Sequence, residues 1–75
     1  MKDLLVSIVR SLVNDPDAVT VDRYDQGDLV VLELRVAPDD MGKVIGKQGR
    51  IAQAIRALMK ARAARDGRRV DVKIV

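Results

Sequence analysis

The 75 residues include 14 Lys or Arg, 11 Asp or Glu and neither His nor Cys, which gives a net charge of +3. So short a chain predicts one small domain, residues 1–75, whose core buries only about 60% of the unfolded surface. Without Cys there is no disulfide or thiolate metal site, and without His the commonest general base and metal ligand is missing. We therefore expect neither an enzyme nor a bound cofactor or metal.

The charge is unevenly distributed along the chain. Residues 1–41 contain four basic and nine acidic side chains, whereas residues 42–75 contain ten basic and two acidic ones, so the two parts carry −5 and +8. This asymmetry favours a surface that meets a polyanion, although a solvated basic helix face gives the same pattern. The sequence shows no signal peptide and no apolar run of the roughly 20 residues that cross a bilayer, so we expect a cytoplasmic protein without a membrane partner.

The first part of the chain predicts a helix followed by a hairpin. Apolar residues recur at helical spacing over residues 2–14, and Asn14-Asp15-Pro16 stops that pattern. Alternating apolar residues around Val19 and Val21, and again from Val30 to Val36, predict two antiparallel strands. The residues 25–28, Asp-Gln-Gly-Asp, predict the tight turn between them.

The second part predicts two helices and a last strand. A short helix begins at Pro38, where Asp39 and Asp40 complement its dipole, and a long one runs from Arg50 to Gly67. We expect the long helix to bury Ile51, Ile55, Leu58 and Met59. The last strand is marked by the alternating residues Val70, Val72 and Ile74. The order αββααβ predicts an α+β fold with a three-stranded mixed sheet, parallel second and third strands, and helices packed on one face.

Two glycines, Gly46 and Gly49, interrupt the helical pattern, and glycine inside a helix costs about 1 kcal/mol relative to alanine. A turn between the two helices explains both glycines. The free N–H groups at the start of the long helix favour a phosphate there. Lys47 and Gln48 at the tip of the turn, with Arg50 behind them, offer charge and hydrogen bonds to a nucleic-acid backbone.

Two other phosphate-binding loops can be tested on the same residues. A nucleotide-hydrolysing P-loop requires glycine where Met41 stands, and Ser or Thr where Gln48 stands. A dinucleotide-binding loop requires a preceding strand and one more glycine. Both are rejected, which leaves a nucleic-acid backbone as the favoured ligand and a plain corner between two helices as the alternative.

The stretch VIGKQGRIAQAIRAL, residues 44–58, resembles the signature of the K-homology (KH) RNA-binding domain, and the element order resembles its type II, bacterial arrangement. A chain that consists of one such domain is similar to the small bacterial KhpA proteins. The resemblance covers essentially all 75 residues. It implies that the loop from Gly46 to Gly49 clamps about four single-stranded nucleotides. It also implies a groove beside the loop, lined in part by Gly42, Lys43 and Ile45. Arg68 and Arg69, in the loop on the other side of the groove, would add phosphate contacts, with solvated loop arginines as the alternative.

The same resemblance implies an RNA chaperone or post-transcriptional regulator. Such proteins act with a larger KH-containing partner, KhpB, and affect cell shape and cell-wall homeostasis. A protein–protein adaptor that retains the KH fold is the alternative, but an acidic loop would favour it and Lys47 and Gln48 do not. Recognition by aromatic stacking is not expected, because the only aromatic residue, Tyr24, lies on the first strand.

Small side chains on one flank of the long helix favour a dimer. These are Ala54, Ala57, Ala61 and Ala64. They would let another helix approach closely, although alanine also suits exposed helix positions. Because pairing two weak sites raises the effective affinity, we expect a homodimer or a heterodimer with a KhpB-like protein. Helical spacing places Arg62 close to the apolar stripe of the long helix, and the sequence suggests no role for it there.

Overall fold

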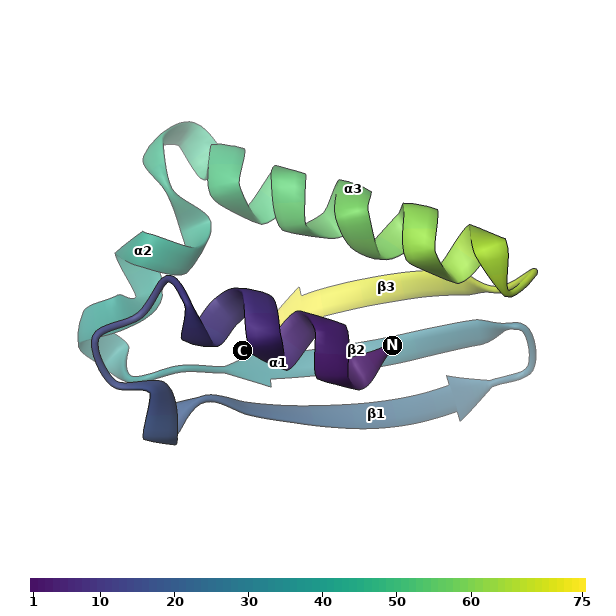
Figure 1. Cartoon of the computed structure of the whole chain (residues 1–75), viewed down its shortest axis with the longest axis horizontal. Coiled ribbons are helices and arrows are strands. Elements are labelled where there is room, and N and C mark those ends of the chain that lie inside the picture. Colours follow the sequence, from purple (N-terminus) through teal and green to yellow (C-terminus); the bar gives the residue numbers. More distant parts are fainter.

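Helices cover one face of a three-stranded sheet in the computed structural model, which describes residues 1–75 (Figure 1). The α-helices are α1 (Lys2–Arg10), α2 (Met41–Ile45) and α3 (Arg50–Arg65), and the strands are β1 (Thr20–Gln26), β2 (Leu29–Arg35) and β3 (Arg69–Ile74). Short 3-10 turns, η1 to η3, lie at Pro16–Ala18, Pro38–Asp40 and Lys47–Gly49. The predicted α+β fold is confirmed. None of the helices has the length and apolar composition needed to cross a bilayer.

The sheet has the strand order β1-β2-β3, with β1 antiparallel and β3 parallel to β2, as predicted. Val30 lies opposite Val70, and Leu32 lies opposite Val72, so apolar side chains of neighbouring strands meet on the face under the helices. β3 pairs only with β2 and is therefore an edge strand. Its open side runs beside α3 (Figure 1).

One hydrophobic core is shared by the helices and the sheet. Its buried members are Leu5, Val9, Val19, Val21, Val30, Leu32, Leu34, Val44, Ile55, Met59, Ala63, Val70 and Val72. The expectation that Leu58 faces inward is wrong, because its side chain is 56% exposed. Ala52 and Ala63 are buried instead, on the stripe of α3 that also holds Ile55 and Met59. Their small side chains let α3 lie close to the sheet.

α1 is shorter than the helix predicted over residues 2–14, because the chain turns more tightly after Arg10. The hydroxyl of Ser11 donates to the carbonyl of Ile8 at 2.6 Å. The N–H of Leu12 donates to the carbonyl of Val9, three residues back, at 3.0 Å. A side-chain bond of this kind competes with helix propagation, and the helix ends before the residues that precede Pro16.

Asp40 is the only buried charged residue, with 2% of its surface exposed, and it joins two distant parts of the chain. Its carboxylate accepts hydrogen bonds from the backbone N–H groups of Asn14 at 3.1 Å and Asp15 at 3.0 Å. The ammonium of Lys43 lies 3.5 Å away. These partners in the loop after α1, which no sequence pattern indicates, tie that loop to the start of α2. Asp39, in contrast, is exposed. Its exposure is consistent with a residue that acts only on the helix dipole.

The same contacts set the ionisation of Asp40. The hydrogen bond from Asn14 lowers the pKa of the carboxyl below its ordinary value of 3.8, with further help from Asp15 and Lys43 and against the opposing effect of burial. A lowered native pKa stabilises the fold at pH values above 3.8. That stabilisation is lost as the pH falls through the native pKa.

We predict that Asp40→Asn lowers the free energy of unfolding at neutral pH, because an amide is a weaker acceptor and turns an NH2 group toward a backbone donor. The difference from the parent should shrink in acid, as the pH falls through the lowered native pKa and the parent carboxyl loses its charge. Urea denaturation at neutral pH and at a series of acid pH values measures the effect. Asp39→Asn is the matched control, and it should change stability little. A difference that persists unchanged in acid would contradict the role given to the carboxylate charge.

Candidate nucleic-acid interface

The loop from Gly46 to Gly49 joins α2 to α3 at one corner of the molecule (Figure 1). Gly46 has φ 75° and ψ 174°, Gln48 has φ 58° and ψ 26°, and Gly49 has φ 74° and ψ 13°. All three conformations are ones that L side chains rarely adopt. The positive φ angles let the chain leave one helix and enter the next within four residues.

The two glycines of the loop are required for different reasons. A Cβ atom on Gly46 would lie 2.5 Å from Cγ1 of Ile51, so the first turn of α3 packs directly against the backbone of Gly46. A Cβ atom on Gly49 would meet nothing within 4 Å, and only its φ of 74° favours glycine there. Gly46 is therefore a packing requirement, whereas Gly49 leaves open space at the entrance to α3.

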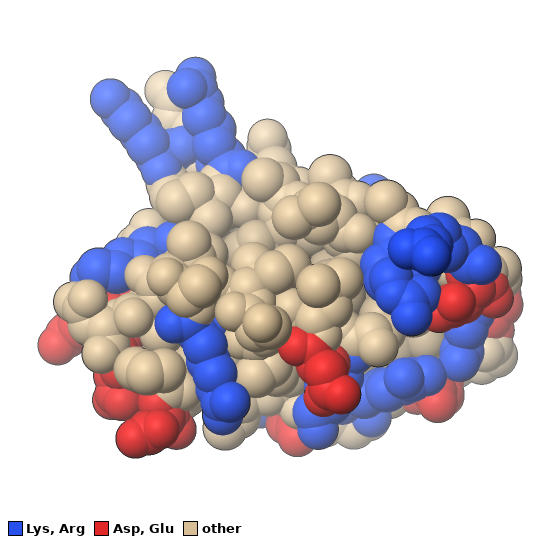
Figure 2. Space-filling view, viewed as in Figure 1, with Lys and Arg blue, Asp and Glu red and all other residues tan.

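The end of α3 beside this loop is electropositive. The N–H of Arg50 donates to the carbonyl of Lys47, but no side chain caps the helix and its first turn holds no acidic residue, so no carboxylate offsets the positive end of its dipole. Lys47 and Gln48 are exposed at the tip, and the guanidinium of Arg50 donates to Oε1 of Gln48 at 3.4 Å. Figure 2 shows basic side chains projecting from this corner of the molecule. The arrangement suits an anion.

α2 extends the surface next to the loop. Gly42, Lys43 and Ile45 are all exposed, and Ile45 leaves 38% of its side-chain surface open although it is apolar. The ammonium of Lys43 forms an ion pair with the carboxylate of Asp40, and this pair keeps the positive charge of Lys43 on the same face. The structure therefore brings together the part of the predicted site that runs from Gly42 to Arg50.

Arg68 and Arg69 lie at the opposite end of α3. The 16 residues of α3 span about 24 Å. The guanidinium of Arg68 donates to the carbonyl of Gly27 at 3.2 Å and lies 3.5 Å from the carboxylate of Asp25. Arg69 lies 3.3 Å from the carboxylate of Asp28. Both arginines are thus held against the turn of the hairpin and away from the loop, although their predicted phosphate contacts stay a prediction.

Of the four basic residues of α3 outside the predicted contacts, Arg56 and Lys60 lie beside β3. Nε of Arg56 donates to the carbonyl of Val72 at 3.1 Å, across the open edge of β3. Lys60 follows one turn later and lies on the same flank of α3. The spacing of four residues is the sequence signal that puts both side chains on one flank. They continue a line of positive charge from the loop along β3.

The flank of α3 that turns away from the sheet is exposed. Ala54, Ala57, Ala61 and Ala64 are all exposed, and Ala64 lies at the edge of this flank, near Leu29 and Val70 of the sheet. Leu58, the most exposed large apolar side chain of the molecule, lies among them. Arg62 has a local partner, because its guanidinium lies 2.7 Å from the carboxylate of Asp66 one turn later.

Comparison with known proteins gives closely similar chains. The family model described as "KhpA/KhpB, KH domain" matches residues 2–74. The chain is 55% identical to RNA-binding protein KhpA of Clostridium acetobutylicum and 53% identical to that of Caldanaerobacter subterraneus subsp. tengcongensis, over 75 residues that make up 100% of both chains. RNA-binding protein KhpA of Borreliella burgdorferi is 45% identical over 73 residues, which are 97% of this chain and 89% of that protein. No solved structure matches significantly.

We predict that Gly46→Ala lowers the free energy of unfolding by about 1–3 kcal/mol or more. This range is the usual cost of an L residue in such a backbone conformation. The clash with Ile51 adds to that cost. Gly42→Ala is the matched control, because its Cβ atom would meet nothing within 4 Å inside a helix. It should leave stability unchanged or raise it by about 0.5–1 kcal/mol. Equal effects of the two substitutions in urea denaturation would show that Gly46 is not held by packing.

Proposed function

Since the chain belongs to the KhpA/KhpB KH-domain family, we propose that it is a non-enzymatic protein that binds single-stranded RNA through the loop from Gly46 to Gly49. The mixed sheet with its helices on one face agrees with the type II KH fold. The relatives are named RNA-binding proteins, which supports RNA as the ligand. The observation that carries the proposal is the exposed basic loop in front of an uncapped helix N-terminus.

In this proposal a backbone phosphate lies against the first N–H groups of α3. The helix dipole and the charges of Lys47 and Arg50 attract it, and the amide of Gln48 adds neutral hydrogen bonds. Because Gly49 carries no Cβ, the sugar–phosphate backbone can approach the main chain closely. About four nucleotides would be held in this way, with bases beside Gly42 and Ile45 on α2.

No aromatic platform takes part in this recognition. Tyr24, the only aromatic side chain, lies on β1, away from the loop. The bases would instead rest on aliphatic and backbone surfaces, without the roughly 1–3 kcal/mol per base that stacking on an aromatic side chain contributes. Affinity should therefore depend mainly on the phosphates.

The family also supports finer proposals about the role of this protein. We propose a single domain of residues 1–75 that acts as an RNA chaperone or post-transcriptional regulator. By the same resemblance it works with a KhpB-like partner and affects cell shape and cell-wall homeostasis. We propose that it acts in the cytoplasm.

The loop is tested by replacing Lys47 and Gln48 with Asp together. Binding of a single-stranded RNA oligonucleotide, measured by fluorescence anisotropy, should fall at least about tenfold, because the introduced charges repel the phosphates. Thermal stability should change little, since both side chains are exposed.

The control variant also replaces one Lys and one Gln with Asp, but on the face of the sheet that carries no helices. Replacing Lys73 and Gln26 with Asp makes the same change in net charge at two exposed strand positions. This control should retain most of the affinity. If the loop variant binds as tightly as the parent, the clamp is wrong and the adaptor function becomes the better account.

We propose further that two chains pair through the outer flank of α3. The small side chains of Ala57 and Ala61 would let two helices approach closely, and Leu58 would be covered by the contact. A C2 pair uses the same surface twice, so one exposed stripe is sufficient. Pairing would present two loops to one RNA and raise the effective affinity. A KhpB-like partner could occupy the same flank.

Ala61→Tyr should convert the parent dimer to monomers in sedimentation at micromolar concentration, because the larger side chain holds the two helices apart. Ala61→Ser, which keeps the position small, should remain dimeric, and so should the loop double variant. RNA affinity of the tyrosine variant should fall through lost avidity. A parent that sediments as a monomer over this whole range would exclude the homodimer and leave a heterologous partner for the flank.

A further inference from the structure

The turn of the hairpin between β1 and β2 carries two acidic residues beside the start of β3. Asp25 and Asp28 stand on either side of this turn, and both are exposed. The backbone N–H of Arg69 donates to the carbonyl of Asp28 at 3.0 Å, and Arg69 lies opposite Leu29 in the parallel pairing of β2 and β3. The backbone therefore fixes the turn next to the first residue of β3.

The two carboxylates hold both arginines that were predicted to contact phosphate on this side of the groove. The guanidinium of Arg68 lies 3.5 Å from the carboxylate of Asp25, and that of Arg69 lies 3.3 Å from the carboxylate of Asp28. Asp25 also accepts a hydrogen bond from Nε of Arg23 at 3.0 Å. The proposed function leaves this acidic turn without a role.

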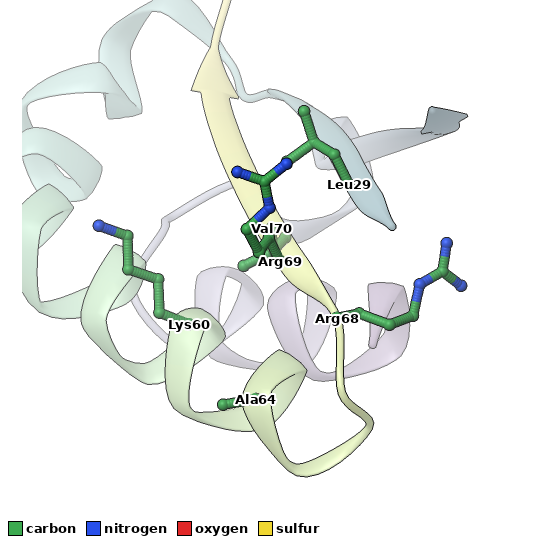
Figure 3. Close-up of a pocket in the computed structure, with 6 residues that line it drawn as sticks. All are labelled: Leu29, Lys60, Ala64, Arg68, Arg69 and Val70. Carbon is green, nitrogen blue, oxygen red and sulfur yellow. The ribbon is translucent and has the colours of Figure 1, made fainter. Parts of the chain in front are cut away.

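Both arginines line the only pocket of the molecule, which lies between the end of α3 and the start of β3 (Figure 3). The pocket has a volume of about 390 Å³, and its other lining residues are Leu29, Lys60, Ala64 and Val70. Figure 3 shows the two guanidinium groups leaving the backbone in different directions, Arg69 along the pocket and Arg68 away from it. Each arginine accordingly has a carboxylate of its own in the turn.

These ion pairs are exposed enough to be exchanged. The side chains of Arg69 and Asp28 are 72% and 66% exposed, and that of Asp25 is 54% exposed. Exposed pairs contribute little to stability, so an RNA phosphate can replace the carboxylate on either arginine. The phosphate contact then gains only the difference between the two anionic partners. The carboxylates thus compete with RNA, and being in the same chain they do so at a high effective concentration.

The acidic turn is too far from the loop to act on it directly. The 16 residues of α3 separate the two ends of the molecule by about 24 Å. The Debye length at physiological ionic strength is only about 8 Å, so charges at the turn are screened before they reach a phosphate at the loop. An effect of Asp25 and Asp28 on RNA binding must therefore pass through the arginines that they hold.

We propose that Asp25 and Asp28 limit the RNA affinity of this protein by occupying Arg68 and Arg69 when no RNA is bound. This inference rests on the proposed function and adds to it a competitor within the same chain. A strand that is anchored at the loop brings its next phosphates to the arginines at a high effective concentration and displaces the carboxylates. A phosphate that arrives from solution lacks this advantage. The turn thereby reserves the two arginines for strands already held at the loop.

The test replaces Asp25 and Asp28 with Asn together and measures binding of a ten-nucleotide oligouridylate by fluorescence anisotropy. Affinity should rise about threefold to tenfold, because RNA no longer has to break two exposed ion pairs. The gain should shrink as the salt concentration rises, since salt screens such pairs. It should be absent when the same two substitutions are made in a chain that carries Arg68→Ala and Arg69→Ala. Thermal stability should stay close to that of the parent.

The matched control replaces Asp17 and Asp22 with Asn, which makes the same change in net charge at two exposed positions away from the turn. Asp22 also forms an exposed ion pair, with Arg35 at 3.1 Å, so the control frees one arginine as well. Its affinity should rise less than about twofold.

Three outcomes contradict the inference while the loop site stands. These are an unchanged affinity of the Asp25 and Asp28 variant, an equal gain in the control, and a gain that persists without Arg68 and Arg69. The last two would show that the acidic residues act through net charge alone. A parent that does not bind the RNA would overturn the proposed function and this inference with it.

Discussion

The close approach of Ile51 to the backbone of Gly46 determines how the candidate site is presented. No Cβ atom fits between them, so the first turn of α3 packs directly on the end of α2. Ile55 and Met59, further along the same helix, anchor α3 in the core against the sheet. With both helices held in this way, Lys47 and Gln48 can only project from the corner of the molecule. The exposure of the loop is thus a consequence of packing beneath it.

The distribution of ion pairs explains why this corner is the most favourable place for a polyanion. Most acidic side chains near the hairpin and the end of α3 have basic partners, in the pairs Asp22–Arg35, Asp25–Arg23, Asp25–Arg68, Asp28–Arg69 and Asp66–Arg62. Lys47 and Arg50 have no acidic partner within 4 Å. The charge asymmetry of the sequence therefore becomes a spatial one. Other basic residues, among them Lys60 and Arg65, also lack an acidic partner, but at the loop the dipole of α3 adds to the positive charge.

Local patterns in the sequence were sufficient for the elements, the sheet and the loop, because glycine positions and apolar periodicity depend on neighbouring residues alone. They failed where a distant contact decides the outcome. Leu58 is as apolar as a core residue, but α3 turns the smaller Ala63 toward the sheet. Asp40 reads as a helix-dipole partner, yet it binds backbone groups 25 and 26 residues away. The pocket, too, forms only when α3, β2 and β3 come together.

The central claim, that the loop from Gly46 to Gly49 holds the RNA backbone, is tested most directly by NMR. Amide resonances of the labelled parent would be followed while single-stranded RNA is added. The account predicts that the largest shift changes fall on the amides of Gly46 to Ile51, with smaller ones on α2, because those N–H groups surround the bound phosphate. Saturable changes confined to α1 or to the sheet face without helices, with the loop amides unmoved, would contradict it.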